Sequence, residues 1–146
     1  MIEWYLRSFM RNLINRFKEN PKSLVLIDLI GAFISTISLG FVLVYLEAYF
    51  GIPRQALYLL ALLASFLILF DGYIYYQVKH ESIGKQLKIL GFLNTSYVIF
   101  SLVFVSFFHF SSVLKLGWIY LLLEVLIVLF LATLEIQVAG AIRKEI

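Results

Sequence analysis

Residues 24–47 read LVLIDLIGAFISTISLGFVLVYLE, a run without Lys or Arg that decides the fold. At about 1.5 Å of rise per residue, a helix of this length extends roughly 36 Å, enough to cross the hydrocarbon core of a bilayer. Runs of similar length and composition follow at residues 56–78, 87–109 and 116–138. Because backbone polar groups inside a bilayer must be satisfied within the protein, these runs predict four transmembrane helices.

The composition of the whole chain agrees with this prediction. Of the 146 residues, 62% are hydrophobic and only 14% are charged, whereas about a quarter of the residues of a soluble domain are charged. Soluble globular folds and disordered chains are thereby excluded, and the lack of cysteine excludes disulfide scaffolds and thiolate metal sites. We expect an all-α polytopic membrane protein, in which residues 1–146 form a single integral membrane domain built as a four-helix transmembrane bundle.

The distribution of basic residues predicts the orientation of this bundle. One side of the predicted membrane carries Arg7, Arg11, Arg16, Lys18, Lys22, Lys79, Lys85, Lys88, Arg143 and Lys144, and the other carries only Arg54 and Lys115. Since basic residues concentrate in cytoplasmic segments, we expect both termini and the 79–86 loop to lie in the cytoplasm, with the protein in a plasma (inner) membrane. The net charge of +3 then indicates topology and attraction to anionic lipids, and we expect no nucleic-acid partner.

Residues 1–20 have the pattern of an amphipathic helix. One broad face carries Ile2, Tyr5, Leu6, Phe9, Met10, Leu13, Ile14 and Phe17. Arg7, Arg11 and Lys18 lie opposite, and Asn20-Pro21 ends the pattern. This arrangement predicts an interfacial helix whose basic side contacts anionic lipid headgroups. The alternative is a helix that packs beneath the bundle or binds a partner.

Four acidic residues lie inside the predicted spans, and they are the candidate functional groups. An ionisable group at mid-bilayer costs about 2.5–3.5 kcal/mol on insertion scales and usually faces the bundle interior. No Lys or Arg inside the spans can neutralise Asp28, Asp71, Glu124 or Glu135, so each must bind a proton, reach water or hold a cation. Counting along the helices, we expect a cytoplasm-facing polar pocket lined by Asp28, Asp71, Asn94 and Glu135, with Glu124 deeper; the identity of any metal stays open.

Two of these acids have a simpler interpretation, which we favour for them. Asp28 and Glu135 lie near the ends of their spans, where they would hydrogen-bond or contact basic side chains that reach inward from the interface. The basic residues within reach are Lys22, Arg143 and Lys144. For Asp71 and Glu124 we favour a functional or interhelical role.

The first span also carries a stripe of small residues. Gly31, Ser35 and Ser38 follow Asp28 at helical spacing and share its face. Small residues let helices approach closely, so we favour a packing seam within the bundle or between copies of the chain. The alternative is a polar path that leads up from Asp28.

The sequence favours a role without catalysis. No glycine-rich phosphate loop, nucleophile elbow or paired-histidine motif is present, and we expect no cofactor. The leading hypothesis is an ion- or proton-coupled transporter or channel-like protein that uses the intramembrane carboxylates, with Asp71 and Glu124 titrating or binding a cation. The alternative is a non-catalytic membrane subunit or lipid-organising scaffold, and an intramembrane enzyme ranks third. Because four helices bury little surface, we also expect a homo-oligomer or a membrane-protein partner.

Overall fold

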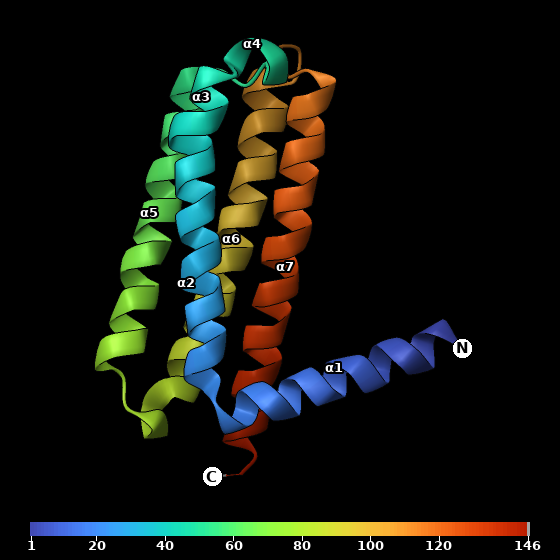
Figure 1. The fold of residues 1–146 in the computed structure, drawn as a ribbon, viewed down its shortest axis with the longest axis vertical. Helices are drawn as coiled ribbons and strands as arrows, with labels where there is room; N and C mark the ends of the chain where they lie inside the picture. The colour runs from blue at the N-terminus through green and yellow to red at the C-terminus, as the bar shows by residue number, and fades with distance from the viewer. Residues whose placement is uncertain (146) are drawn as a thin grey trace.

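The computed structural model describes residues 1–145, which form helices joined by short connections (Figure 1). The helices are α1 (Ile2–Glu19), α2 (Pro21–Ile37), α3 (Leu43–Tyr45), α4 (Glu47–Phe50), α5 (Arg54–Gln77), α6 (Ile83–His109) and α7 (Lys115–Arg143). A π-helical segment, η1 (Ser38–Val42), joins α2 to α3, and a 3₁₀ turn, η2 (His80–Ser82), precedes α6. Residues 1–145 contain no strand, so the prediction of an all-α fold is confirmed.

Four helical stretches are long and apolar enough to cross a membrane: Pro21–Tyr45, Arg54–Gln77, His80–His109 and Lys115–Arg143. They stand side by side as a bundle (Figure 1), as the sequence predicted. The first stretch begins at Pro21 rather than at Leu24, because proline fits the first helical turn, where its missing N–H is not needed. The last stretch continues to Arg143, beyond the predicted end at residue 138.

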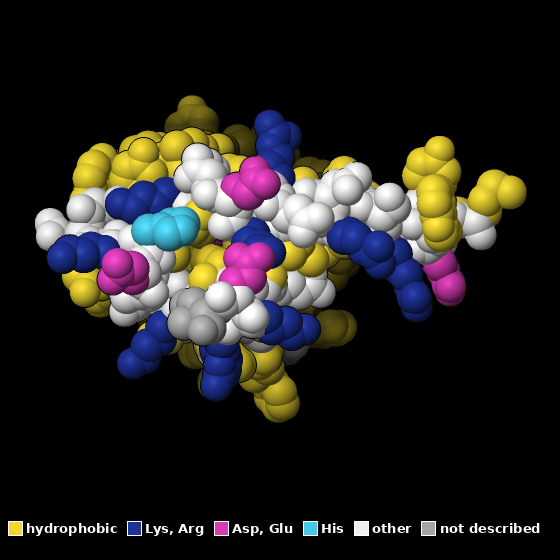
Figure 2. Space-filling model, turned by 90° about the horizontal axis from the view of Figure 1, so that it is seen from below, with side chains coloured by type: hydrophobic (Ala, Val, Ile, Leu, Met, Phe, Trp, Pro, Cys, Tyr) yellow, Lys and Arg dark blue, Asp and Glu magenta, His cyan; other side chains and the backbone are white. Residues whose placement is uncertain are grey.

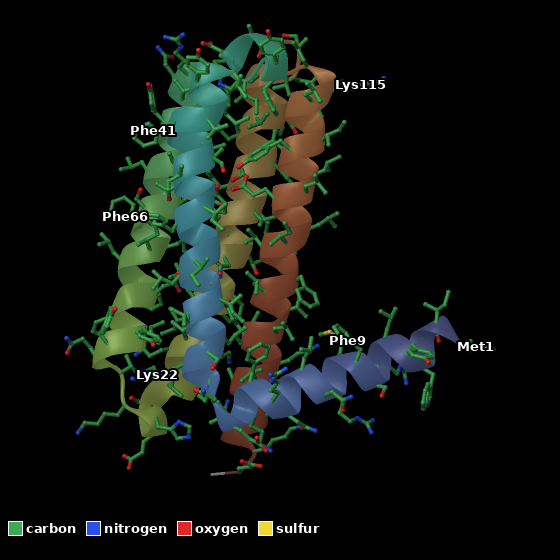
Figure 3. The ribbon with its side chains drawn as sticks, in the orientation of Figure 1. Met1, Phe9, Lys22, Phe41, Phe66 and Lys115 are labelled. Atoms are coloured by element: carbon green, nitrogen blue, oxygen red, sulfur yellow. The ribbon has the colours of Figure 1, made fainter. Side chains whose placement is uncertain are left out.

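The outward faces of these helices are apolar. Phe41 and Phe66 point away from the bundle in Figure 3, and their side chains are exposed. The end of the bundle where α1 lies is here called the lower end. Many Lys and Arg side chains lie around the edge of this end (Figure 2). An apolar band above a basic rim is the surface expected of a protein embedded in a bilayer.

Helix α1 runs sideways from the lower end of the bundle (Figure 1). Its second half packs against the lower part of the core through Met10, Leu13, Ile14 and Phe17. Near its end, Lys18 forms an ion pair with Glu145. The first half extends beyond the bundle, and Ile2, Trp4, Tyr5 and Leu6 are exposed there. A helix is present over these residues, and its amphipathic, interfacial character and its contact with lipid stay predictions.

The bundle consists of two helical hairpins that differ in how they contact each other. Within the hairpins, α2 packs along α5, and α6 packs along α7. Between the hairpins, α5 contacts α6 along part of its length, whereas α2 and α7 meet at few points. Gly91 shows how close α6 and α7 are, because a Cβ atom there would lie 2.6 Å from Ile136 Cγ1 and 3.0 Å from the Ala132 carbonyl oxygen.

At the opposite, upper end, the turn after α4 is fixed against the start of α7. The Leu114 N–H donates a hydrogen bond to the Phe50 carbonyl oxygen at 3.0 Å. Gly51 adopts a left-handed conformation with φ of 70°, which glycine tolerates without steric cost. Gly117 faces the same Phe50 carbonyl so closely that a Cβ atom would overlap the oxygen.

Replacing Gly117 by alanine is expected to lower the free energy of unfolding by about 2 kcal/mol, because the added methyl group meets backbone rather than a flexible side chain. Gly140→Ala in the same helix is the matched control, since a Cβ there meets nothing within 4 Å. Thermal unfolding in detergent measures both variants. Equal melting temperatures for the two would contradict this account of the upper end.

Candidate functional site

Four polar side chains, one from each long helix, meet in the lower half of the bundle. They are Asp28 of α2, Asp71 of α5, Asn94 of α6 and Glu135 of α7, here called the acid cluster. Their exposed fractions are 4%, 0%, 2% and 0%. The structure therefore brings together the residues that the sequence placed in one pocket, and in this conformation they are shielded from solvent.

Asn94 is the centre of the acid cluster. Its Nδ2 donates hydrogen bonds to Asp28 Oδ2 at 2.8 Å and to Glu135 Oε2 at 3.1 Å. The carboxyl group of Asp28 also lies beside those of Asp71 and Glu135. One amide thus joins acids from both hairpins, since Asp28 belongs to the α2–α5 hairpin and Glu135 to the α6–α7 hairpin.

Asp71 differs from the other members of the cluster. Both of its carboxyl oxygens are buried, and neither has a hydrogen-bond donor among residues 1–145, but the Asp28 carboxyl lies close enough to accept a hydrogen bond from Asp71 when Asp71 is protonated. Buried polar atoms in native proteins are almost always hydrogen-bonded, and leaving one unsatisfied costs about 1–3 kcal/mol. Ionised Asp71 is therefore a destabilising group in this conformation, whereas protonated Asp71 can donate to the Asp28 carboxyl.

The acid cluster contains three carboxyl groups and no base. Asp28 and Glu135 hydrogen-bond, as expected, but their donor is Asn94 rather than a basic residue. Lys22 Nζ instead donates to the Tyr75 carbonyl oxygen at 2.9 Å. Within residues 1–145, the ion pairs are Lys18–Glu145 and Arg54–Glu47, both remote from the cluster. Because adjacent carboxylates repel one another, the cluster requires protons or a small cation from solution to become neutral.

The acid cluster does not have the arrangement of a metal site. In the described part of the chain, no group of three or more His, Cys, Asp or Glu residues is arranged to hold a metal. Protons need no such coordination geometry, because a proton can be shared between two neighbouring carboxyl oxygens.

Glu124 forms a second polar site farther up the bundle. Tyr97 Oη donates a hydrogen bond to Glu124 Oε1 at 3.1 Å, and the hydroxyl groups of Ser35 and Tyr120 lie nearby. Glu124 is 8% exposed. On α7 it precedes Glu135 by about three turns, roughly 16 Å along the axis, so the two acids belong to separate sites.

A cavity of about 330 Å³ connects the two sites. It lies between α2 and α7, where the hairpins are least closely packed, and is here called the lateral cavity. Its polar lining consists of Asp28, Ser35, Ser38, Asn94, Tyr97, Tyr120 and Glu124. The remainder of the lining is mostly aliphatic, for example Leu67, Ile127 and Leu131.

The small-residue stripe of the first span faces this cavity. Gly31, Ser35 and Ser38 all line it, and a Cβ atom at Gly31 would have only Leu131 nearby, at 3.9 Å. Within one chain, the stripe therefore borders the lateral cavity, and the packing seam and the polar path both stay predictions. A contact between this stripe and a second copy stays a prediction.

The remaining candidate residues lie at the lower end. Arg7 and Arg11 are exposed on α1 and border a shallow hollow that α1 forms with Gln137 of α7. Lys18, which was grouped with them as a membrane-surface residue, is paired with Glu145. Arg7 and Arg11 thus remain available to contact lipid headgroups.

The sequence interpretation missed the two tyrosines at the upper site. Tyr120 resembles an interfacial aromatic residue in the sequence, but it lines the lateral cavity. Tyr97 could have been found, because Asn94, Tyr97 and Ser101 recur at helical spacing and all three are buried on one face of α6. Three polar residues on one face of a transmembrane helix indicate a face turned toward other polar groups.

No protein family, curated protein or solved structure matches this chain. Its class is defined by its own features, namely four apolar helices of transmembrane length. The chain is a small integral membrane protein with a buried acid cluster.

Proposed function

We propose that this protein moves protons across the membrane, as a small proton-coupled transporter or channel-like protein. The observation that carries the proposal is Asp71, whose buried oxygens have no hydrogen-bond donor among residues 1–145 although two more carboxyl groups lie in the same cluster. An acid that only stabilised helix packing would be expected to have a donor. Binding and release of protons gives a reason for an acid to be retained at such a cost.

The hydrogen bonds of the acid cluster distinguish this role from that of a scaffold. A scaffold would be stabilised if its carboxyl groups were each satisfied by a hydroxyl or amide. Asp28, Glu135 and Glu124 accept hydrogen bonds from Asn94 or Tyr97, whereas Asp71 has no such donor and has the Asp28 carboxyl beside it. The support for proton movement therefore comes from Asp71, and the other acids supply neighbouring positions for the proton.

Asp71→Asn is expected to lower proton flux at least tenfold in reconstituted liposomes, because the amide cannot bind and release a proton at neutral pH. Vesicles loaded with a pH-sensitive dye are given a potassium diffusion potential with valinomycin, and the internal pH is followed. Glu47→Gln is the matched control, because Glu47 is an acid at the upper end paired with Arg54. Wild-type flux equal to that of protein-free vesicles, or an unchanged flux in Asp71→Asn, would overturn the proposal.

We further propose that both termini are cytoplasmic in a plasma membrane and that α1 lies on the anionic inner leaflet. The exposed apolar residues Trp4 and Tyr5, together with the exposed Arg7 and Arg11, support this placement, since such helices lie at the headgroup boundary. The alternative is a partner subunit that covers the same residues.

Trp4 provides a direct test, because the chain has only two tryptophans. In a Trp118→Phe background, brominated phospholipids are expected to quench most of the Trp4 fluorescence in vesicles that contain anionic lipid. Arg7→Gln with Arg11→Gln should reduce the quenching, because the headgroup attraction is lost. Unquenched fluorescence from Trp4 would favour the partner subunit.

A further inference from the structure

We propose that the lateral cavity binds a lipophilic organic cation, held by the carboxyl group of Glu124 and by the rings of Tyr97 and Tyr120. This inference deepens the proposed function and rests on it, because it names the class of solute that the protons would be exchanged for. It is argued from the size, charge and opening of the cavity.

The cavity has the size and composition of a ligand site. Its volume of about 330 Å³ lies within the range of about 300–1,000 Å³ typical of small-molecule pockets. Such pockets combine an apolar lining with a few convergent polar groups. Here aliphatic side chains from α2, α5 and α7 supply the apolar walls, and Glu124 with Tyr97 supplies the polar groups.

The charge of the lining selects the kind of ligand. The cavity is lined by two acids, Asp28 and Glu124, and by no Lys or Arg from the described chain. Tyr97 and Tyr120 line it beside Glu124, and aromatic rings attract cations, most strongly where water is excluded. An acyl chain of a lipid would fill the same volume but would leave the negative charge of the ionised carboxyl groups uncompensated, because their donors Asn94 and Tyr97 are neutral. A positively charged apolar molecule is therefore the better occupant.

The rim of the cavity indicates how a ligand enters. Ile34, Leu123 and Ile127 line the cavity and are 59%, 56% and 60% exposed. These residues belong to the apolar outward faces of α2 and α7, within the segments long enough to cross the membrane. The entrance therefore faces hydrocarbon, and a solute reaches it after dissolving in the bilayer.

The same cavity links the ligand to the acid cluster. Asp28 and Asn94 belong to the cluster and also line the cavity. A cation near Glu124 lowers the free energy of ionised carboxyl groups in the same low-dielectric space, since opposite charges attract strongly there. Binding of the cation and loss of a proton are thereby coupled.

Equilibrium dialysis of radiolabelled tetraphenylphosphonium against the protein in lipid nanodiscs tests the inference, with empty nanodiscs as the blank. Wild-type protein should show saturable binding that Glu124→Gln weakens at least tenfold. Ser35→Leu should weaken it similarly, because the larger side chain occupies the cavity without changing its charge. Glu47→Gln should bind as wild type, and neutral triphenylphosphine oxide should not compete.

Two results would overturn the inference: wild-type protein without saturable binding, or Glu124→Gln and Ser35→Leu with wild-type affinity. Circular dichroism of each variant verifies that it is folded, and two variants of different chemistry keep the test valid if one of them does not fold. Binding lost in both variants, together with wild-type proton flux that equals that of protein-free vesicles both without and with tetraphenylphosphonium, leaves the cation site standing and removes the proposed function. Proton flux that depends on Asp71, without saturable cation binding, supports the proposed function and removes the cation site.

Discussion

Replacement of Asn94 by leucine is expected to lower the free energy of unfolding by about 3 kcal/mol. Asn94 Nδ2 is the donor to both Asp28 and Glu135, and both acceptors are buried. Removing one partner from a buried charged interaction is costly, because the remaining groups keep the desolvation penalty without the hydrogen bond. Because the lost hydrogen bonds involve acids of both hairpins, the contact between the two hairpins should weaken.

Unfolding in mixed micelles of increasing denaturing detergent measures this effect. Ser96→Leu is the matched control, because Ser96 is an exposed polar residue of the same helix whose hydroxyl bonds only to its own helix, at the Phe92 carbonyl. Such a surface change is expected to stay within about 0.5 kcal/mol. If Asn94→Leu proved as stable as Ser96→Leu, the carboxyl groups would be satisfied without Asn94, and the cluster described here would be wrong.

Asp71→Asn is expected to raise stability by about 1–2 kcal/mol while it removes proton flux. The amide has nearly the same shape as the carboxyl group, but it supplies N–H donors beside the Asp28 carboxyl and reduces the number of acids in the cluster from three to two. Both changes favour the folded state. Functional groups are commonly destabilising, so a variant that gains stability and loses activity identifies an acid kept for its chemistry.

The same detergent titration, paired with the flux measurement, separates the two candidate functions. Glu81→Gln is the control, because Glu81 is an exposed acid in the lower connection. Its replacement should change neither the stability nor the proton flux. A scaffold predicts the opposite result for Asp71→Asn, namely lower stability with no flux to lose. Lower stability together with unchanged flux would eliminate Asp71 as a proton carrier.

The fold could be predicted because the bilayer imposes a length on each apolar run. Four runs without Lys or Arg predicted four helices, and the structure has them. The helix ends were predicted less well, because a helix can continue beyond the end of its apolar run. Helix α7 continues through Gln137 and Gly140 to Arg143. The π-helical segment η1, which contacts α5, had no recognisable signal in the sequence.

The acid cluster was predictable from depth alone. A fixed rise per residue places Asp28, Asp71, Asn94 and Glu135 at one level of the bundle. Which groups bond to one another depends on the rotation of each helix about its axis, which the sequence does not give. The unsatisfied state of Asp71 and the position of the lateral cavity depend further on the spacing between the hairpins.

The unequal contacts between the hairpins restrict which movements the protein can make. The α5–α6 edge is closed by packing, whereas the α2–α7 edge has few contacts. The Asn94–Asp28 hydrogen bond joins the hairpins through α6 and α2. Near the α2–α7 edge, α1 contacts α7 at the lower end of the bundle and α4 contacts α7 at the upper end. The weakly packed α2–α7 edge is thus restrained at both of its ends, and any separation of the hairpins there would be greatest between the ends, beside the lateral cavity.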